Sequence, residues 1–461
     1  MSVLNKYVGN KAFYKMTLTV ALPIMVQNLI TNFVSMLDNL MIGALGTEQM
    51  SGVSIVNQLM FVFNLAIFGA LSGAGIFTAQ FFGKNDTKGI QYTLRYKFAV
   101  SVLLLIAGIV VFTVFDDNLI NLYLHDSDSA GNIALTLSFA KKYLRVMLIG
   151  CLPFCIAQTF SSTLRETGET LAPMVAGFLA VLTNCAFNWV LIFGKLGFPA
   201  LGVEGAAIAT VISRYVECAI VIAYTVKQRH RFTYLKGALK SLKMPGKVFK
   251  DITVKGMPLL VNEFFWSLGM SLLSMAYSLH GIDVVAGVSI STTVMNLANI
   301  AFISLGSSIG IIIGKQLGAN KFDEAVDTDR KLIAFSVALS AVIGVIVFLI
   351  GDKIPEFYNT SAESKELAAY FIKVCSLFIP VHAFANASYF TIRSGGKTLI
   401  TFLMDSVFIM CVNVPIAFAL VKVFNLSIWA IFPIVQSIDI LKVIVGLILV
   451  KKKVWLNNIV Q

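Results

Sequence analysis

Charged side chains are scarce in this chain of 461 residues. Asp, Glu, Lys and Arg make up 13% of it, whereas hydrophobic residues make up 57% and the mean hydropathy is +0.83. An average water-soluble domain carries about 25% charged residues. The composition therefore excludes a soluble globular protein and predicts one that lies almost entirely within a membrane.

Cysteine and histidine are also few, and neither forms a ligand pattern. The six cysteines stand singly, and the four histidines include no pair at metal-ligand spacing. Gly395–Thr398 resembles the tail of a phosphate-binding loop, but Thr391 stands where that motif needs a glycine, and a helix rather than a strand precedes it. We therefore expect no cofactor, no ATP hydrolysis and no enzyme within the membrane.

Long hydrophobic runs dominate what is present. Twelve of them can cross about 30 Å of hydrocarbon as helices. They lie near residues 15–42, 51–80, 93–115, 138–161, 171–193, 203–226, 252–279, 285–314, 331–351, 366–392, 398–421 and 427–450. All should be helical, because a lone segment in lipid must satisfy its own backbone hydrogen bonds. The predicted fold is an all-α polytopic membrane protein with twelve transmembrane helices.

The net charge of +12 follows the topology of such a protein. If both termini are cytoplasmic, most Lys and Arg fall on inner loops and tails, as the positive-inside rule requires. The densest basic segment runs from Lys227 to Lys255, whereas the outer loop after the third span carries Asp116 and Asp117. The expected partner is therefore the lipid bilayer, and nucleic-acid binding is not expected.

The first half of the chain is repeated in the second half, about 235 residues later. Pro23 returns as Pro258, Gly83 returns as Gly318, and the motif GVSI at 52–55 returns at 287–290. Later pairs, such as Arg165 and Arg393, continue at a slightly shorter offset. Six spans in each half give parallel repeats, which are typical of secondary transporters with a substrate site between them.

The repeat predicts two pseudo-symmetric lobes of six helices. We place the N-terminal lobe at 1–226, a basic cytoplasmic linker at 227–250 and the C-terminal lobe at 251–461. Rocking one lobe against the other would open a cavity between them to each side in turn. Because no ATP site is predicted, an ion gradient remains as the energy source.

Asp38 is the outstanding ionisable residue. It lies near the outer end of the first span, and its counterpart in the second repeat is Leu273, so the carboxylate belongs to one lobe only. A charge at membrane depth is expensive and needs a cation to neutralise it. A proton, a sodium ion or a cationic substrate can each do so, which is a simple basis for exchange. The alternative is an aspartate that caps a helix end.

Other ionisable residues in the spans have less specific interpretations. Glu263 in the seventh span fits either a substrate contact or a structural role as a gate or a salt bridge to a loop lysine, and Asp405 in the eleventh span is similar. Asp439 and Lys442 are three residues apart on one helix, so they can neutralise each other as a structural pair.

Uncharged polar side chains add candidates for the cation site and the cavity. Gln58 lies on the second span, Gln158 on the fourth, and Asn184 and Asn188 share one face of the fifth. Amides in apolar helices also act as packing contacts.

Pro23 and Pro258 each remove a backbone hydrogen bond, so their helices can bend, which in the first span would move Asp38. A static kink is equally compatible with these prolines.

The motifs together resemble the multidrug and toxic compound extrusion (MATE) transporters over nearly the whole chain. They are ALPIMVQNLI and LDNLMIGALG in the first span, GVSIVNQ and GAGIFTAQFFGKND through the second, LRETGET after the fourth, and NCAFNWVLIFGKLGFPALGVEGAAIAT across the fifth and sixth. The resemblance implies efflux of cationic or amphipathic small molecules in exchange for H⁺ or Na⁺ by alternating access. It also implies a prokaryotic branch with an acidic first span.

In that branch, the cation site of the N-terminal lobe looks like Asp38 with Asn184, Asn188 and Thr210, with Na⁺ as the one metal ion to consider. Many members of the family carry an aspartate where this chain has Asn188. One formal charge instead of two favours protons over sodium.

Our sequence-based interpretation is an antiporter in a prokaryotic cytoplasmic membrane, expected to be a monomer. Span positions predict a substrate cavity lined by Met36, Gln58, Phe61, Phe154, Gln158, Glu263 and Trp266. The alternative function is a flippase for lipid-linked oligosaccharides of the same superfamily. Such a flippase would need basic residues at mid-membrane for pyrophosphate, and the spans offer none there.

Overall fold

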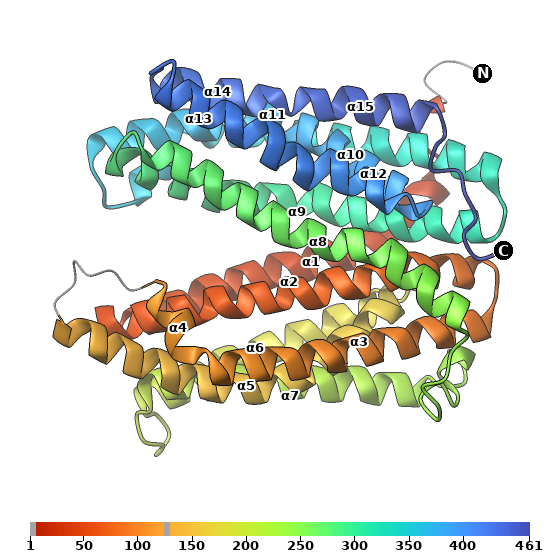
Figure 1. Cartoon of the computed structure of the whole chain (residues 1–461), viewed down its shortest axis with the longest axis horizontal. Helices are drawn as coiled ribbons and strands as arrows, with labels where there is room; N and C mark the ends of the chain where they lie inside the picture. Colours follow the sequence, from red (N-terminus) through yellow and green to blue (C-terminus); the bar gives the residue numbers. More distant parts are fainter. Residues whose placement is uncertain (1–5, 124–129) are drawn as a thin grey trace. The chain divides into compact units, whose positions relative to one another are not determined.

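The structure, a computed structural model, describes residues 6–123 and 130–461, without the side chains of residues 35, 36, 40 and 130–132. Within these residues, twelve helices are long and apolar enough to cross a membrane. Figure 1 shows their order along the chain. Those of the first half are α1 (Lys11–Gly43), α2 (Thr47–Gly83), α3 (Thr87–Val114), α5 (Ala130–Glu166), α6 (Leu171–Phe193) and α7 (Gly202–Lys227).

The second half repeats this order. Its spans are α8 (Gly246–Ser278), α9 (Ile282–Gly318), α10 (Phe322–Ile350), α11 (Ala362–Ser394), an eleventh span from Thr398 to Lys422 and a twelfth from Ile428 to Lys451. The twelve predicted spans are therefore confirmed, although most helices are longer than predicted. A helix of 37 residues such as α2 is about 55 Å long, so it extends beyond the hydrocarbon that set the predicted length.

The last two spans are not continuous α-helices, which the sequence analysis did not predict. The eleventh consists of α12 (Thr398–Phe402), two π-helical segments, η4 (Leu403–Val407) and η5 (Ile409–Asn413), and α13 (Val414–Lys422). The twelfth is divided at Asp439 into α14 (Ile428–Ile438) and α15 (Ile440–Lys451). Short elements α4 (Asp116–Asn121), η2 (Thr233–Leu235) and η3 (Ile354–Phe357) lie between spans.

The chain folds into two compact units. One contains residues 26–78 and 87–252, and the other contains Met1–Met25, Ala79–Asp86 and Thr253–Gln461. In the first unit, α7 packs on α5 and α6, around a core built from α2, α5 and α7. In the second, α11 packs on α9 and α10, around a core that reaches α8 and α14.

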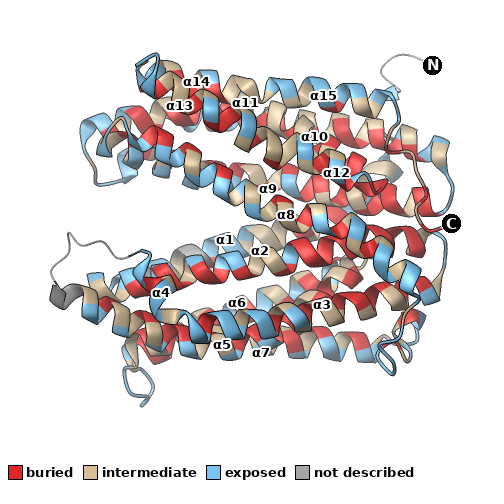
Figure 2. Cartoon of the chain, in the orientation of Figure 1, coloured by how far each residue is buried: buried red, intermediate tan, exposed pale blue. Residues whose placement is uncertain are grey.

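The outer faces of these helices are apolar, as lipid requires. On α3, Leu103 and Ile106 are 66% and 56% exposed, and on α10, Val345 and Leu349 are 60% and 71% exposed. Figure 2 shows such exposed residues along α3, whereas much of α9 is buried. Because exposed apolar surface of this extent is unfavourable in water, the fold itself indicates a lipid environment.

The connection after α7 is fastened to the unit that precedes it. Arg95 donates to the carbonyls of Ala238 and Lys243, at 2.6 Å each. The Tyr234 hydroxyl lies 3.0 Å from Thr167 Oγ1. Burial raises the pKa of Tyr234 to about 12, so this phenol stays neutral throughout the physiological range. The segment between α7 and α8 is thus ordered by contacts rather than a free tether.

Two glycines of the repeat allow the end of α2 to cross the end of α9. A Cβ added at Gly83 would lie 1.9 Å from the carbonyl oxygen of Lys315, and one added at Gly318 would lie 1.9 Å from that of Gln80. After each glycine, Asn85 and Asn320 adopt positive φ values of 59° and 58°. Asparagine tolerates this left-handed conformation, which ends both helices in the same turn.

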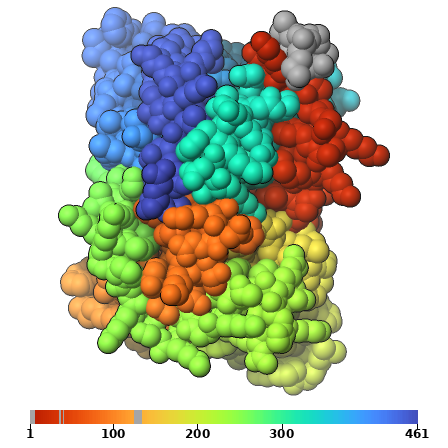
Figure 3. All heavy atoms as spheres, turned by 90° about the vertical axis from the view of Figure 1, so that its right-hand side faces the viewer, coloured from red at the N-terminus to blue at the C-terminus, as the bar shows by residue number. Residues whose placement is uncertain are grey.

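The segment 452–461 packs over this crossing. Trp455 is 1% exposed, and the Ile459 amide donates to Gln80 Oε1 at 2.8 Å. Asn458 Nδ2 donates to Asn320 Oδ1 at 2.7 Å, and Lys84 Nζ donates to the Val460 carbonyl at 2.7 Å. In Figure 3 this dark blue segment lies beside the turquoise end of α9 and the orange turn after α2.

We expect Gly318→Ala to destabilise the protein by about 1–3 kcal/mol, because the new methyl group meets backbone that cannot rotate away. Gly246→Ala is the matched control, since nothing lies within 4 Å of a Cβ there. Thermal unfolding of the purified variants in detergent measures the difference. Equal melting temperatures for the two variants would contradict the crossing.

Candidate cation site

Asp38 lies near the end of α1, where it meets two neighbouring helices of its own unit. Asn188 on α6 donates from Nδ2 to Asp38 Oδ1 at 2.6 Å. The same nitrogen donates to Asn184 Oδ1 at 3.1 Å, one helical turn away. Asn184 in turn contacts Thr210 Oγ1 on α7 at 3.2 Å. The four side chains proposed from the sequence as a cation site thus form one hydrogen-bonded chain.

The side chains that α6 contributes to the site are almost fully buried from solvent. Asn184 is 4% exposed and Asn188 is 1% exposed, whereas Asp38 is only partly buried. A carboxylate in such surroundings is poorly solvated, so a positive partner or a proton stabilises it. Asp38 is therefore not a surface cap of a helix end.

The Asn184 amide can adopt two orientations, and they suit different states of Asp38. In one, its nitrogen donates to Thr210 and its oxygen accepts from Asn188. In the other, its nitrogen donates to the two Asp38 oxygens at 2.8 and 3.3 Å, and its oxygen accepts from Thr210. The second orientation suits an ionised carboxylate. The first suits a protonated one, whose hydroxyl can donate to the amide oxygen.

Oxygen atoms predominate at this site. Besides the Asp38 carboxylate, it holds the Thr210 hydroxyl, the Asn184 amide oxygen and Asn188 Oδ1, which is buried and has no hydrogen-bond partner among the described residues. Hard cations such as Na⁺ prefer oxygen ligands of this kind. Among the described residues no group of three or more His, Cys, Asp and Glu side chains gathers. One carboxylate with neutral amide and hydroxyl oxygens around it has the chemistry to bind a proton or a single monovalent cation.

Tyr143 on α5 lies beside this site, and the sequence analysis did not place it there. Asp38 and Arg214 both act electrostatically on Tyr143, whose hydroxyl donates to Asn57 Oδ1 at 3.3 Å. The Arg214 guanidinium lies 5.0 Å from the centre of the Phe154 ring. A single tyrosine in a long apolar helix carries no signal of its own, so only the fold could reveal it.

The residues predicted to line a substrate cavity are divided between the two units. In the first unit, Phe61 is 43% exposed, Gln58 is exposed, and Gln158 Oε1 accepts from Arg165 at 3.4 Å. In the second, Trp266 is 37% exposed and Glu263 is partly buried. The side chain of Met36 lies outside the described residues. The cavity itself stays a prediction.

Pro23 and Pro258 lie inside α1 and α8, and both helices continue through them. Their role in bending stays a prediction.

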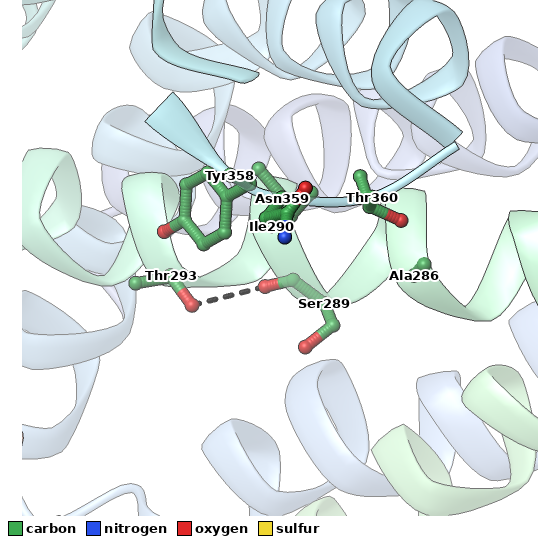
Figure 4. A pocket seen from close by; sticks show the side chains of 7 residues that line it. All are labelled: Ala286, Ser289, Ile290, Thr293, Tyr358, Asn359 and Thr360. Carbon is green, nitrogen blue, oxygen red and sulfur yellow. Dashed lines mark hydrogen bonds between the residues drawn. The ribbon is translucent and has the colours of Figure 1, made fainter. Parts of the chain in front are cut away.

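A small pocket of about 240 Å³ lies near the start of α9, below the residues that follow η3. Figure 4 shows Tyr358, Asn359 and Thr360 over Ser289 and Thr293. It contains no charged residue and is smaller than usual ligand sites, about 300–1,000 Å³.

Comparison with known proteins decides the family. The profile of the MatE family matches the chain twice, at residues 23–190 and 258–419. This chain belongs to the MatE family. The two matches begin at Pro23 and Pro258, so they coincide with the internal repeat. As a MATE protein, the chain is a multi-pass membrane transporter and not an enzyme.

Relatives of the MATE chain match it almost from end to end. A probable multidrug resistance protein NorM from Thermotoga maritima is 28% identical over 90% of this chain and 87% of its own length. The probable multidrug resistance protein YoeA from Bacillus subtilis is 23% identical over 95% of this chain and 94% of its own. Both relatives are bacterial.

Solved structures of MATE transporters share the fold. An outward-facing multidrug resistance MATE family transporter of the MOP superfamily superposes with a TM-score of 0.84 at 17% identity, covering 98% of each chain. A mutant of the Vibrio cholerae MATE transporter VcmN superposes with a TM-score of 0.84 at 15% identity, over 96% of this chain and 98% of that one. The all-α fold with twelve spans in two six-helix repeats is thereby confirmed.

Proposed function

We propose that this MATE protein is a secondary antiporter that exports cationic or amphipathic small molecules in exchange for an inward-moving cation. The observation that carries the proposal is the contact of Asp38 with Asn184, Asn188 and Thr210 in a poorly solvated site. The names of the bacterial relatives support drug-like substrates. The acidic first span supports a place in the prokaryotic branch that uses such a residue.

Exchange follows from the single charge of Asp38. A buried carboxylate must be neutralised, and a proton and a cationic substrate both supply one positive charge. If only one of them fits at a time, loading from one side of the membrane expels the other occupant. The Asn184 amide makes the two states structurally distinct, because its preferred orientation depends on whether Asp38 carries a proton.

We further propose that protons drive the exchange. The four oxygen-bearing side chains at the site carry one formal charge, and the remaining ligands are neutral amides and a hydroxyl. A sodium site with one carboxylate competes poorly with hydration, whereas a proton needs only one carboxylate oxygen and an acceptor. Na⁺ remains the alternative ion.

The membrane, topology and assembly are also proposals. The excess of Lys and Arg on one set of loops supports both termini in the cytoplasm, and the bacterial relatives support the cytoplasmic membrane of a prokaryote. The repeat supports lobes at 1–226 and 251–461, joined by the basic segment 227–250. We propose that one chain suffices for transport, as a monomer.

Transport in proteoliposomes under separately imposed gradients tests the proposal. We expect uptake of a fluorescent organic cation to follow a pH gradient and to ignore a sodium gradient. Asn188→Asp places a second carboxylate beside Asp38, whose Oδ1 lies 2.6 Å from Nδ2 of Asn188 in the unaltered protein. It should therefore add sodium dependence, because two charges bind Na⁺ more tightly. Transport by the unaltered protein that follows sodium alone would contradict the proton proposal.

A further inference from the structure

The segment that follows the last span holds the end of α2 in the second unit. We call this segment, residues 452–461, the strap (Figure 3). Lys84, just beyond the end of α2, donates from Nζ to the Val460 carbonyl at 2.7 Å. Both residues belong to the second unit, although most of α2 belongs to the first. The strap therefore binds α2 where this helix passes from one unit to the other.

Gln80 is the centre of this attachment, and its side chain is fully buried. A glutamine amide offers two N–H donors and one carbonyl acceptor. Nε2 donates to the carbonyls of Ser394 at 2.8 Å and Asn457 at 3.2 Å, and Oε1 accepts from the Ile459 amide at 2.8 Å. Both donors and the acceptor of Gln80 are thus used, and none of these bonds is made to α2 itself.

The attachment belongs to one repeat only. At the offset that relates Gly83 to Gly318, the counterpart of Gln80 is Lys315, whose ammonium lies 4.8 Å from the centre of the Phe82 ring. The glycine crossing is therefore alike in both repeats, whereas the amide that receives the strap is present in the first alone. The strap is a feature added to one side of a symmetrical crossing.

The strap also has an anchor on the helices of the second repeat. Trp455 is almost completely buried in a core that contains Leu317 of α9 and Leu332 of α10. Asn458 Nδ2 donates to Asn320 Oδ1 at 2.7 Å, just beyond the end of α9. These contacts involve no residue of α2, so they can persist when the end of α2 moves.

The two attachments of the strap differ in how easily they are broken. Withdrawal of Trp455 would transfer a large apolar ring from a packed core into water, which is strongly unfavourable. The contacts with Gln80 and Lys84 are hydrogen bonds, which can be exchanged for bonds to water at a small net cost. The end of α2 can therefore leave the strap while the strap stays on the second unit.

We propose that the strap is a latch, which holds the end of α2 in the second unit in one state of the transport cycle and releases it in the other. This inference rests on the proposed exchange by alternating access, in which two lobes move against each other. Because α2 begins in the first unit, movement of that unit pulls on the end of the helix. The last residues of the strap then leave Gln80 and Lys84, whereas Trp455 stays in its core. Latching favours the state that is closed at this end of the molecule, the cytoplasmic end in the proposed topology.

Reducible crosslinks in two double variants test the latch. Lys84→Cys with Val460→Cys lets a short bismethanethiosulfonate reagent join the strap to the end of α2, and Asn320→Cys with Asn458→Cys lets it join the strap to the end of α9. Both carry Cys411→Ser, because this cysteine is exposed and the other five are buried or half-buried. We expect the first crosslink to slow tetraphenylphosphonium transport in proteoliposomes at least tenfold, and reduction to restore it. The second is the matched control and should leave transport unchanged, because the strap stays on α9 in both states.

A strap that only stabilises the fold would tolerate both crosslinks equally, since each joins parts that are already in contact. Transport that is unaffected by the first crosslink, or lost equally with both, would therefore overturn the latch. Absence of transport by the unaltered protein would instead count against the proposed function. In that case, or if a crosslink does not form, hydrogen exchange decides.

Hydrogen exchange followed by mass spectrometry tests the latch without transport. Gln80→Leu removes the amide that receives the strap, so the amides of residues 79–86 should exchange at least tenfold faster. Those of residues 309–317, in the core that anchors the strap, should keep their slow exchange. The control is Gln91→Leu, which removes a bond from Gln91 Nε2 to the Lys236 carbonyl at 3.1 Å in the first unit and should change neither segment. Unchanged exchange at 79–86 in Gln80→Leu, or faster exchange in both segments, would contradict a latch with a separate anchor.

Discussion

Asp38→Asn should abolish coupled efflux while the protein still folds and reaches the membrane. Asparagine keeps the size of the side chain and can still bond to Asn188, but it cannot exchange a proton or balance a cation. We expect the rate of dye export to fall at least tenfold, because no other carboxylate belongs to this hydrogen-bonded chain. Dye efflux from cells without pumps of their own measures the loss.

Asp117→Asn is the matched control. This aspartate lies on α4, is 53% exposed and pairs with Lys141 at 2.6 Å, so its charge is already solvated and neutralised. It should transport like the unaltered protein when equal amounts are present in the membrane. Undiminished efflux by Asp38→Asn would exclude Asp38 from the coupling mechanism.

Lys97→Met should cause the largest loss of stability of any single substitution discussed for this chain. Lys97 on α3 is fully buried, and its ammonium binds Ser162, Thr163 and Glu166. Without it, Glu166 becomes a largely buried charge that has lost its cation. Breaking such a pair by removing one partner costs about 3–5 kcal/mol. Denaturant unfolding in detergent micelles measures this loss of free energy.

The double variant Lys97→Met with Glu166→Gln should recover most of the stability, because neither charge then remains unpaired. Lys88→Met, which changes an exposed lysine at the start of the same helix, serves as the control. A double variant no more stable than Lys97→Met would show that the lysine acts through packing and not through its charge.

The two repeats use the same threonine position for opposite charges. Thr163 accepts from Lys97 at 3.2 Å in the first half, whereas Thr391, its counterpart at the later repeat offset, donates to Asp329 at 2.5 Å in the second. Because a hydroxyl both donates and accepts, it serves either partner without a change of residue. The duplicated scaffold therefore tolerated divergence of its buried charges.

Most of the fold could be predicted because its signals are local or repeated. Hydrophobic length located the twelve spans, and paired motifs such as Pro23 with Pro258 located the two halves. Asp38 stood out by its charge, its grouping with Asn184, Asn188 and Thr210 came from motif resemblance, and the structure joins the four side chains by hydrogen bonds. Their role in transport stays a prediction until it is measured.

The remaining features have no local signal. Lys97 and Glu166 are 69 positions apart, and neither motif spacing nor helical periodicity links them. The π-helical segments around Asp405 and Asn413 were not predicted, because nothing in the mostly apolar sequence of the eleventh span distinguishes a π-helix from an α-helix. The pair of Asp439 and Lys442 was correctly predicted from its spacing, but its contact with His382 was not.

The glycine crossing has an evolutionary consequence. Gly83, in the first copy of the repeat, lies against the main chain of the second copy, and Gly318, in the second copy, lies against the main chain of the first. Any residue other than glycine at either position would place its Cβ against main-chain atoms of the other copy. Every residue has these main-chain atoms, so a substitution in the other copy cannot make room. The two copies differ along most of their length, but at this crossing the main chain of each leaves no room for a side chain at the glycine of the other. We therefore expect descendants of the duplication to keep both glycines together.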